Sequence, residues 1–167
     1  GGEPRLHPDL KDVLRRVKAM GYQGKLDTNG SQPALLGEIL AGELVDYIAM
    51  EIKGPLEKYP TITGSPVDIE AIRASITLIR QAGFPYEFRT TLVRSLLAPD
   101  AILLIGRLIE GASRYVLQRF VASKHVAPEF IGEESFSEVD LAAVQAGLTS
   151  LVGECLGRDD GNLARRR

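Results

Sequence analysis

The chain has 167 residues, of which 44% are hydrophobic and 25% are charged, and its formal net charge is -2. This length and composition are those of one globular domain with a sizeable core. The nearly balanced charge argues against a nucleic-acid-binding surface. No apolar run approaches the roughly 20 residues that cross a bilayer. The single cysteine cannot form an internal disulfide, so we expect a reducing, cytoplasmic location.

Helical and strand-like apolar patterns alternate along the chain. The spacing predicts helices over residues 9–20, 33–40, 68–81, 101–110 and 137–156, and strands over 22–26, 45–52, 85–93 and 114–121. The opening Gly1-Gly2-Glu3 would be the end of a further strand. Such alternation predicts an α/β fold with a largely parallel sheet and outer helices. We expect residues 1–123 to form this sheet and residues 124–167 to form a C-terminal helix and tail.

Three polar clusters fall where the predicted strands end. They are Gly1-Gly2-Glu3-Pro4, Asp27-Thr28-Asn29-Gly30 and Glu51-Ile52-Lys53. Parallel sheets bind ligands at the carboxyl ends of their strands, so we expect the clusters to share one site. Each cluster also has a simpler interpretation: a glycine-rich turn, an Asx turn and an exposed strand end, in that order.

Charged residues also occur inside the predicted strands. Glu51 and Lys53 are two residues apart and should share a face, as should Glu87 and Arg89. Buried charges are costly unless they are paired or used. If their strands are neighbours, Asp27 and Glu51 take matching positions, and two carboxylates there would suit a cation or Lys53. A salt bridge on the strand face is an equally good interpretation of Arg89.

Histidine and cysteine add little chemistry. No metal-ligand spacing joins His7 to His125. Cys155, within the predicted last helix, fits a small buried apolar group.

The segments Gly-Gly-Glu-Pro, Leu-Asp-Thr-Asn-Gly, Met-Glu-Ile-Lys-Gly-Pro and Phe-Arg-Thr-Thr, in this order, resemble the radical S-adenosylmethionine (SAM) superfamily. Within it they are most similar to glycyl-radical activating enzymes, in particular the anaerobic ribonucleoside-triphosphate reductase activating group. The resemblance covers about residues 1–120. It implies a partial (β/α)6 barrel, here truncated at its N-terminus.

The resemblance also implies cofactors and partners. A [4Fe-4S] cluster on a Cys-x3-Cys-x2-Cys loop would reduce SAM to methionine and a 5′-deoxyadenosyl radical. The radical would remove a hydrogen from a glycine of the partner, the anaerobic ribonucleotide reductase. Flavodoxin or ferredoxin would donate the electron.

The resemblance assigns SAM-binding roles to several residues. Gly1, Gly2 and Glu3 would receive the methionine ammonium. Asp27 would lie near the ribose or form a monovalent-cation site with Glu51.

Further SAM contacts are implied along the later strands. Asn29 belongs to the cluster that would hold the ribose, and Lys53 and Arg89 would meet the methionine carboxylate and neighbouring polar groups. Gln118 and Phe120 would flank the adenosine, although residue evidence alone favours a structural role for Gln118. Some relatives have a histidine directly after Phe120, where this chain has valine.

The chief departure from the family is the missing cluster loop, which should precede Gly1. Cys155 cannot replace three cysteines that share one cluster. We therefore expect the chain to be a fragment that lacks its N-terminal part and does not cleave SAM, whereas its parent is an enzyme.

Three alternatives remain open. A radical SAM enzyme could act on a small molecule such as a deazapurine precursor. A (β/α) barrel lyase could use Lys53 as a Schiff-base nucleophile, but that chemistry needs a desolvated lysine, and Glu51 beside it would favour the ammonium form. A non-enzymatic interaction module would have no pocket at the strand ends.

Overall fold

The computed structural model describes residues 9–120 and 136–159. The opening residues Gly1, Gly2 and Glu3, the two histidines and the predicted boundary near residue 123 lie outside the described residues. The described strands are β1 (Lys25–Thr28), β2 (Tyr47–Glu51), β3 (Tyr86–Leu92), β4 (Arg114–Arg119) and β5 (Glu154–Asp159). The helices are α1 (Leu10–Ala19), α2 (Pro33–Ala41), α3 (Tyr59–Thr63), α4 (Ile69–Gln81), α5 (Pro99–Leu108) and α6 (Glu138–Leu148), with a short 3-10 turn η2 (Leu56–Lys58) before α3.

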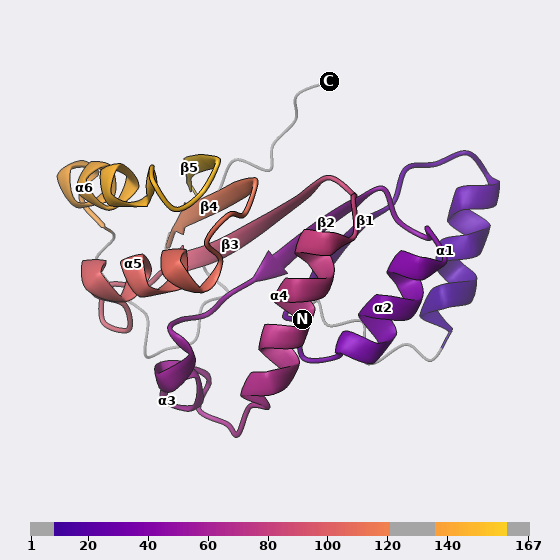
Figure 1. Cartoon of the computed structure of the whole chain (residues 1–167), viewed down its shortest axis with the longest axis horizontal. Coiled ribbons are helices and arrows are strands. Elements are labelled where there is room, and N and C mark those ends of the chain that lie inside the picture. The colour runs from indigo at the N-terminus through magenta and orange to yellow at the C-terminus, as the bar shows by residue number, and fades with distance from the viewer. Residues whose placement is uncertain (1–8, 121–135, 160–167) are drawn as a thin grey trace.

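The strands form one five-stranded sheet in the order β1-β2-β3-β4-β5, and every neighbouring pair is parallel. Figure 1 shows the sheet crossing the molecule with helices packed along it. The predicted α/β fold with a parallel sheet and outer helices is therefore confirmed. Sequential order also makes the strands of Asp27 and Glu51 direct neighbours, with Asp27 opposite Ala49 and Glu51 opposite Arg89.

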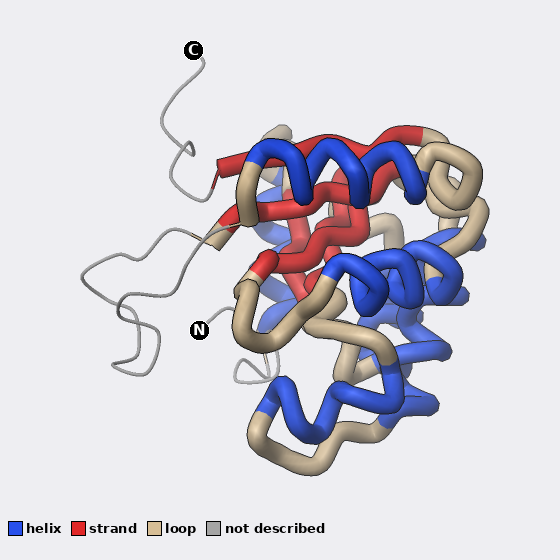
Figure 2. Tube along the Cα trace, turned by 90° about the vertical axis from the view of Figure 1, so that its left-hand side faces the viewer, coloured by secondary structure: helices blue, strands red, loops and turns tan. Residues whose placement is uncertain are grey.

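The two faces of the sheet differ sharply in polarity. Residues such as Ile48, Met50, Phe88 and Leu117 are fully buried and belong to the core that α2, α4, α5 and α6 complete. Figure 2 shows the strands in red with the helices in blue packed around them. Side chains alternate along a strand, so the other face carries the remaining positions. We call this the polar face, and its polar residues are Lys25, Asp27, Tyr47, Glu51, Glu87, Arg89, Thr91, Arg114, Gln118, Glu154 and Arg158.

Side-chain caps fix the starts of two helices. The Asp68 carboxylate accepts hydrogen bonds from the backbone of Glu70 and Ala71 at 3.0 and 3.1 Å, as expected of an N-cap. Ser137 caps α6 in the same way by accepting from the Asp140 backbone at 3.1 Å. None of the helices in the described ranges is both long and apolar enough to traverse a bilayer.

The prediction of one helix over residues 137–156 is wrong in its second half. Helix α6 ends at Leu148, and the chain turns to form β5 beside β4. Backbone bonds from Gly111 to the Leu151 carbonyl and from Gly153 to the Ala112 carbonyl hold this turn. Pairing with β4 satisfies the backbone of residues 154–159, which outweighs the helical spacing of the leucines. Cys155 consequently lies in a strand and is half-buried.

Two smaller differences concern loops. Strand β1 begins three residues later than predicted and includes Asp27, while Tyr22 is exposed. The segment after Gly54-Pro55, which none of the predicted helices and strands covers, contains η2 and α3. Pro60 stands in the first turn of α3, where proline is compatible with a helix.

Candidate functional site

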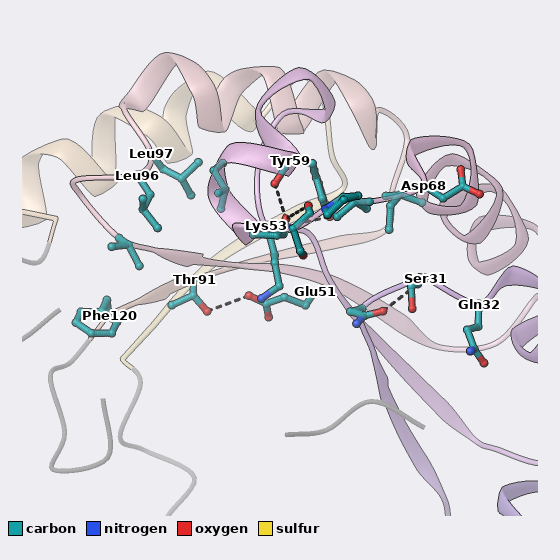
Figure 3. A pocket seen from close by; sticks show the side chains of 18 residues that line it. Ser31, Gln32, Glu51, Lys53, Tyr59, Asp68, Thr91, Leu96, Leu97 and Phe120 are labelled. Atoms are coloured by element: carbon teal, nitrogen blue, oxygen red, sulfur yellow. Dashed lines mark hydrogen bonds between the residues drawn. The ribbon is translucent and has the colours of Figure 1, made fainter. Parts of the chain in front are cut away.

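A pocket of about 830 Å³ opens where the strands end (Figure 3). Its walls come from the loops after β1, β2, β3 and β4, which parallel pairing brings to one edge of the sheet. Its polar lining residues include Asn29, Ser31, Gln32, Glu51, Lys53, Asp68 and Thr91. Its apolar lining residues include Ile62, Val67, Ile72, Val93, Leu96, Leu97 and Phe120, together with Tyr59. Such a cavity suits a ligand with one polar end and one flat apolar end.

The loop after β1 forms a tight turn that also borders the pocket. The Asn29 carboxamide oxygen accepts from the Ser31 backbone at 2.9 Å, which is the Asx turn proposed as the simpler interpretation. Gly30 has a φ of +76°, a conformation that favours glycine, and Ser75 donates to its carbonyl at 2.8 Å. The buried Ser31 hydroxyl has no hydrogen-bond partner in the part of the chain that the structure describes. Asn29 and Ser31 therefore present polar atoms to the pocket from a fixed turn.

Arg89 joins the two carboxylates that the sequence placed on neighbouring strands. One guanidinium nitrogen lies 2.6 Å from Asp27, and Nε donates to Glu51 at 3.1 Å. Thr91 donates to the second oxygen of Glu51 at 3.0 Å (Figure 3). Asp27, Glu51 and Arg89 thus form one cluster on the polar face. The strand-face salt bridge is the arrangement observed, and the cation between the two carboxylates is Arg89 rather than Lys53.

Lys53 has a different environment from Arg89. It follows the end of β2, its side chain is exposed at the pocket, and within residues 9–120 and 136–159 its ammonium has no hydrogen-bond or ion-pair partner. Its backbone N–H donates to the Tyr59 hydroxyl at 3.1 Å (Figure 3). Lys53 is the one lysine or arginine among the residues that line the pocket. A ligand anion in the pocket would therefore be attracted to this ammonium.

Tyr59 and the apolar wall beside it were not predicted from the sequence. Tyr59 starts α3 and is only 2% exposed. Burial raises the pKa of Tyr59 to about 12, an effect opposed by the hydrogen bond from Lys53 and reinforced by the Glu51 charge. The aromatic and aliphatic residues between Gly54 and Val67 were the available signal, because a wholly exposed loop would not need them.

A second polar cluster lies farther from the pocket, on the same face. Glu87 is 2% exposed and accepts from the Tyr47 hydroxyl at 3.0 Å. Lys25 and Arg158 lie 3.5 and 3.6 Å from its carboxylate oxygens. Arg114 donates to Tyr47 at 3.5 Å. Burial is the main cause that raises the pKa of Tyr47, so its hydroxyl stays a donor.

The structure brings some predicted site residues together and separates others. Asn29, Glu51 and Lys53 line the pocket, and Asp27 and Arg89 adjoin it through Glu51. Gln118 is paired in register with Thr91 on the polar face and is half-buried, but it does not line the pocket. Phe120, two residues later, does line the pocket. The predicted ammonium site at Gly1, Gly2 and Glu3 lies outside the described residues.

The residues of this chain do not fit an iron-sulfur cluster. Such a cluster needs several thiolates, whereas the sequence contains one cysteine. Burial raises the pKa of Cys155 to about 11, which disfavours the thiolate that metals bind. Across the two described ranges, no group of three or more His, Cys, Asp or Glu side chains is placed to hold a metal ion.

Comparison with known proteins identifies two homologues. The chain is 30% identical over 135 residues to a protein of Methanocaldococcus jannaschii provisionally named as a glycyl-radical enzyme activating enzyme. It is 31% identical over 94 residues to an AdoMet-dependent heme synthase of Methanosarcina barkeri. The matches cover 78% and 54% of this chain, but only 56% and 27% of the relatives, so the chain spans about half of the first and about a quarter of the second. No protein-family model matches the chain.

A solved structure has the same fold. It is a domain of a pyruvate-formate lyase-activating enzyme from Bacteroides vulgatus, with a TM-score of 0.71, 21% identity and 96% of each chain covered. At this level of identity, the likeness shows the fold alone. The two homologues and this structure are thus named as two activating enzymes and one AdoMet-dependent enzyme.

Proposed function

We propose that this chain forms the SAM-binding part of a radical SAM enzyme that activates a glycyl-radical enzyme. The observation that carries this proposal is the convergence of Asn29, Glu51 and Lys53 on one amphipathic pocket at the strand ends. SAM has a zwitterionic amino-acid end, a ribose and a flat adenine, which match the mixed lining. The homologue named as an activating enzyme supports the same assignment.

In this proposal each part of the SAM molecule is bound by particular residues of the chain. Lys53 binds the methionine carboxylate because its ammonium lines the pocket and has no ion-pair partner among the residues that the structure describes. The turn at Asn29 and Ser31 holds the ribose hydroxyls, and Phe120 lies against the adenine. Asp27 and Glu51, fixed by Arg89, set a negative potential that favours the ammonium and the sulfonium.

The remaining predicted contacts are part of the same proposal. Gly1, Gly2 and Glu3 receive the methionine ammonium, and Gln118 supports the adenosine side. A monovalent cation at Asp27 and Glu51 stays a prediction, since it would have to share both carboxylates with Arg89.

The activity belongs to the full-length protein. The chain supplies no cluster ligands, so cleavage of SAM requires a [4Fe-4S] cluster held by residues outside it. We propose the anaerobic ribonucleotide reductase as the glycyl-radical partner, with flavodoxin or ferredoxin as the reductant and a cytoplasmic location. The order of the motifs supports this narrower assignment.

A small-molecule substrate is the second candidate. The homologue named as a heme synthase shares 94 aligned residues with this chain, so the same segment occurs in a protein named for a different chemistry. The deazapurine alternative belongs to this class. The lyase alternative is less compatible with the structure, because Lys53 is exposed rather than desolvated. The pocket at the strand ends argues against a purely structural interaction module.

The first test is SAM binding by the anaerobically purified full-length protein, measured by equilibrium dialysis. Lys53→Ala should weaken binding about 10- to 100-fold, the value of a charge-assisted hydrogen bond. Lys58→Ala is the matched control, because Lys58 is exposed and does not line the pocket. A folded wild-type protein that binds no SAM would refute the proposal, as would equal losses in the two variants.

The second test separates the two substrate classes. The reduced protein is incubated with SAM and the anaerobic reductase, and a glycyl radical is sought by electron paramagnetic resonance. A radical that requires both SAM and Lys53 supports the activase. SAM cleavage with no radical on the reductase favours a different substrate.

A further inference from the structure

Three hydrogen bonds hold the backbone of Ile52 and Lys53 in place. The Ile52 N–H donates to the Arg89 carbonyl at 2.8 Å, and the Thr90 hydroxyl donates to the Ile52 carbonyl at 2.7 Å. The Lys53 N–H donates to the Tyr59 hydroxyl at 3.1 Å. The tyrosine oxygen is therefore fixed one hydrogen bond away from the residue that offers a cation to the pocket.

The hydrogen of the Tyr59 hydroxyl has no hydrogen-bond acceptor among the described residues. Its oxygen accepts from Lys53, and no described group accepts from it. The side chain is buried yet forms part of the pocket wall. Since its pKa is about 12, the hydroxyl keeps its proton at neutral pH. A buried donor without an acceptor is costly, so a ligand atom or a water must take this hydrogen.

We propose that Tyr59 is a binding residue of the pocket, which donates its hydroxyl hydrogen to the carboxylate of the bound SAM beside Lys53. This inference rests on the proposed function and adds a residue to it. Lys53 is the sole cation among the lining residues, whereas Glu51 and Asp68 repel an anion. The carboxylate is thus drawn toward Lys53, whose own backbone N–H holds the Tyr59 hydroxyl. A donor aimed at a carboxylate forms a stronger bond than one aimed at a neutral oxygen.

The experiment compares Tyr59→Phe with the wild type in the full-length protein, using two probes. SAM carries the carboxylate, and decarboxylated SAM lacks only that group. Tyr59→Phe should weaken SAM binding about 10-fold and change the binding of decarboxylated SAM less than about 2-fold. Dissociation constants are measured by equilibrium dialysis, and thermal unfolding is recorded for each variant.

Tyr86→Phe is the matched control. The Tyr86 hydroxyl also accepts a backbone N–H at 3.1 Å, from Ser113, but it lies at the other end of β3 and outside the pocket. Both variants should lose similar thermal stability, and only Tyr59→Phe should lose SAM affinity. Equal affinity in Tyr59→Phe and wild type would overturn the inference, as would an equal loss for both probes.

A double-mutant cycle tests whether Tyr59 acts on the ligand or through Lys53. Against a Lys53→Ala background, Tyr59→Phe should still weaken SAM binding at least about 3-fold, because the donor contacts the carboxylate directly. Disappearance of the effect would overturn direct donation. A wild-type protein that binds no SAM would instead refute the proposed function, so the two failures are distinguishable.

Discussion

At the scale of single residues, the charges inside the strands were the most informative feature of the sequence. Asp27 directly follows one predicted strand, and Glu51 and Arg89 lie within two others. Charges at such positions are rare unless they are paired or functional. The structure pairs all three around one guanidinium. The sequence could identify the charges but not this pairing, because the partners are far apart in the chain and depend on strand register.

Tyr59 shows the limit of residue-level inference. Nothing local marks its hydroxyl as a pocket donor, because its position depends on the contact between α3 and the residue that follows β2. None of the helices and strands predicted from the sequence covers this segment. A loop side chain acquires its environment only when the elements around it are packed.

The thiol of Cys155 should be unreactive in the folded chain. Partial burial in β5 raises its pKa from 9.0 to about 11, so about 100-fold less thiolate is present at pH 8. We expect reaction with 5,5′-dithiobis(2-nitrobenzoate) to be 10- to 100-fold slower than in the chain unfolded in guanidinium. Equal rates in the two states would show that the strand does not shield the thiol.

At the scale of elements, the contact between α5 and α6 explains why the C-terminal segment stays with the sheet. Gly106 of α5 faces Leu148 and Leu151, and a Cβ on Gly106 would overlap the Leu148 side chain. Leu148 is fully buried and has little room to move. The glycine allows the two helices to approach, which positions β5 beside β4.

Two glycine-to-alanine variants should therefore have opposite effects. Alanine favours a helix by about 1 kcal/mol over glycine, so Gly37→Ala in α2 should stabilise the chain by about 0.5–1 kcal/mol. A Cβ on Gly37 meets only Leu78, at an ordinary 3.9 Å. Gly106→Ala should destabilise it by about 1–3 kcal/mol because of overpacking. Chemical denaturation measures both, and stabilisation by Gly106→Ala would show that α5 and α6 pack less tightly.

At the scale of the whole molecule, the polar face is held together by ion pairs that cross the sheet. The cluster around Glu87 draws one residue from each strand: Lys25, Tyr47, Glu87, Arg114 and Arg158. The helices α2, α4, α5 and α6 pack on the core face, and on the polar face these ion pairs and hydrogen bonds join the neighbouring strands.

Glu87→Ala should lower the free energy of unfolding by about 2–4 kcal/mol, because it removes the buried centre of this network. Glu154→Ala is the control on the same face. Its partner Arg114 lies 2.7 Å away, but both side chains are more than 40% exposed. Its loss should cost less than about 1 kcal/mol. Equal costs in urea denaturation would mean that the Glu87 cluster is no more than a surface ion pair.

The sequence by itself determined the alternation of helices and strands, the parallel sheet and the edge of the sheet where polar residues gather. These follow from local periodicity and from the rule that parallel strands end together. Tertiary structure alone decided that residues 154–159 form a strand. It also decided that Arg89 forms ion pairs with two carboxylates and that the Tyr59 hydroxyl accepts a hydrogen bond from the Lys53 backbone. Each of these depends on contacts between segments that are distant in the sequence. The free energy of such contacts overrides local preference, and the contacts cannot be read from the periodicity of the sequence.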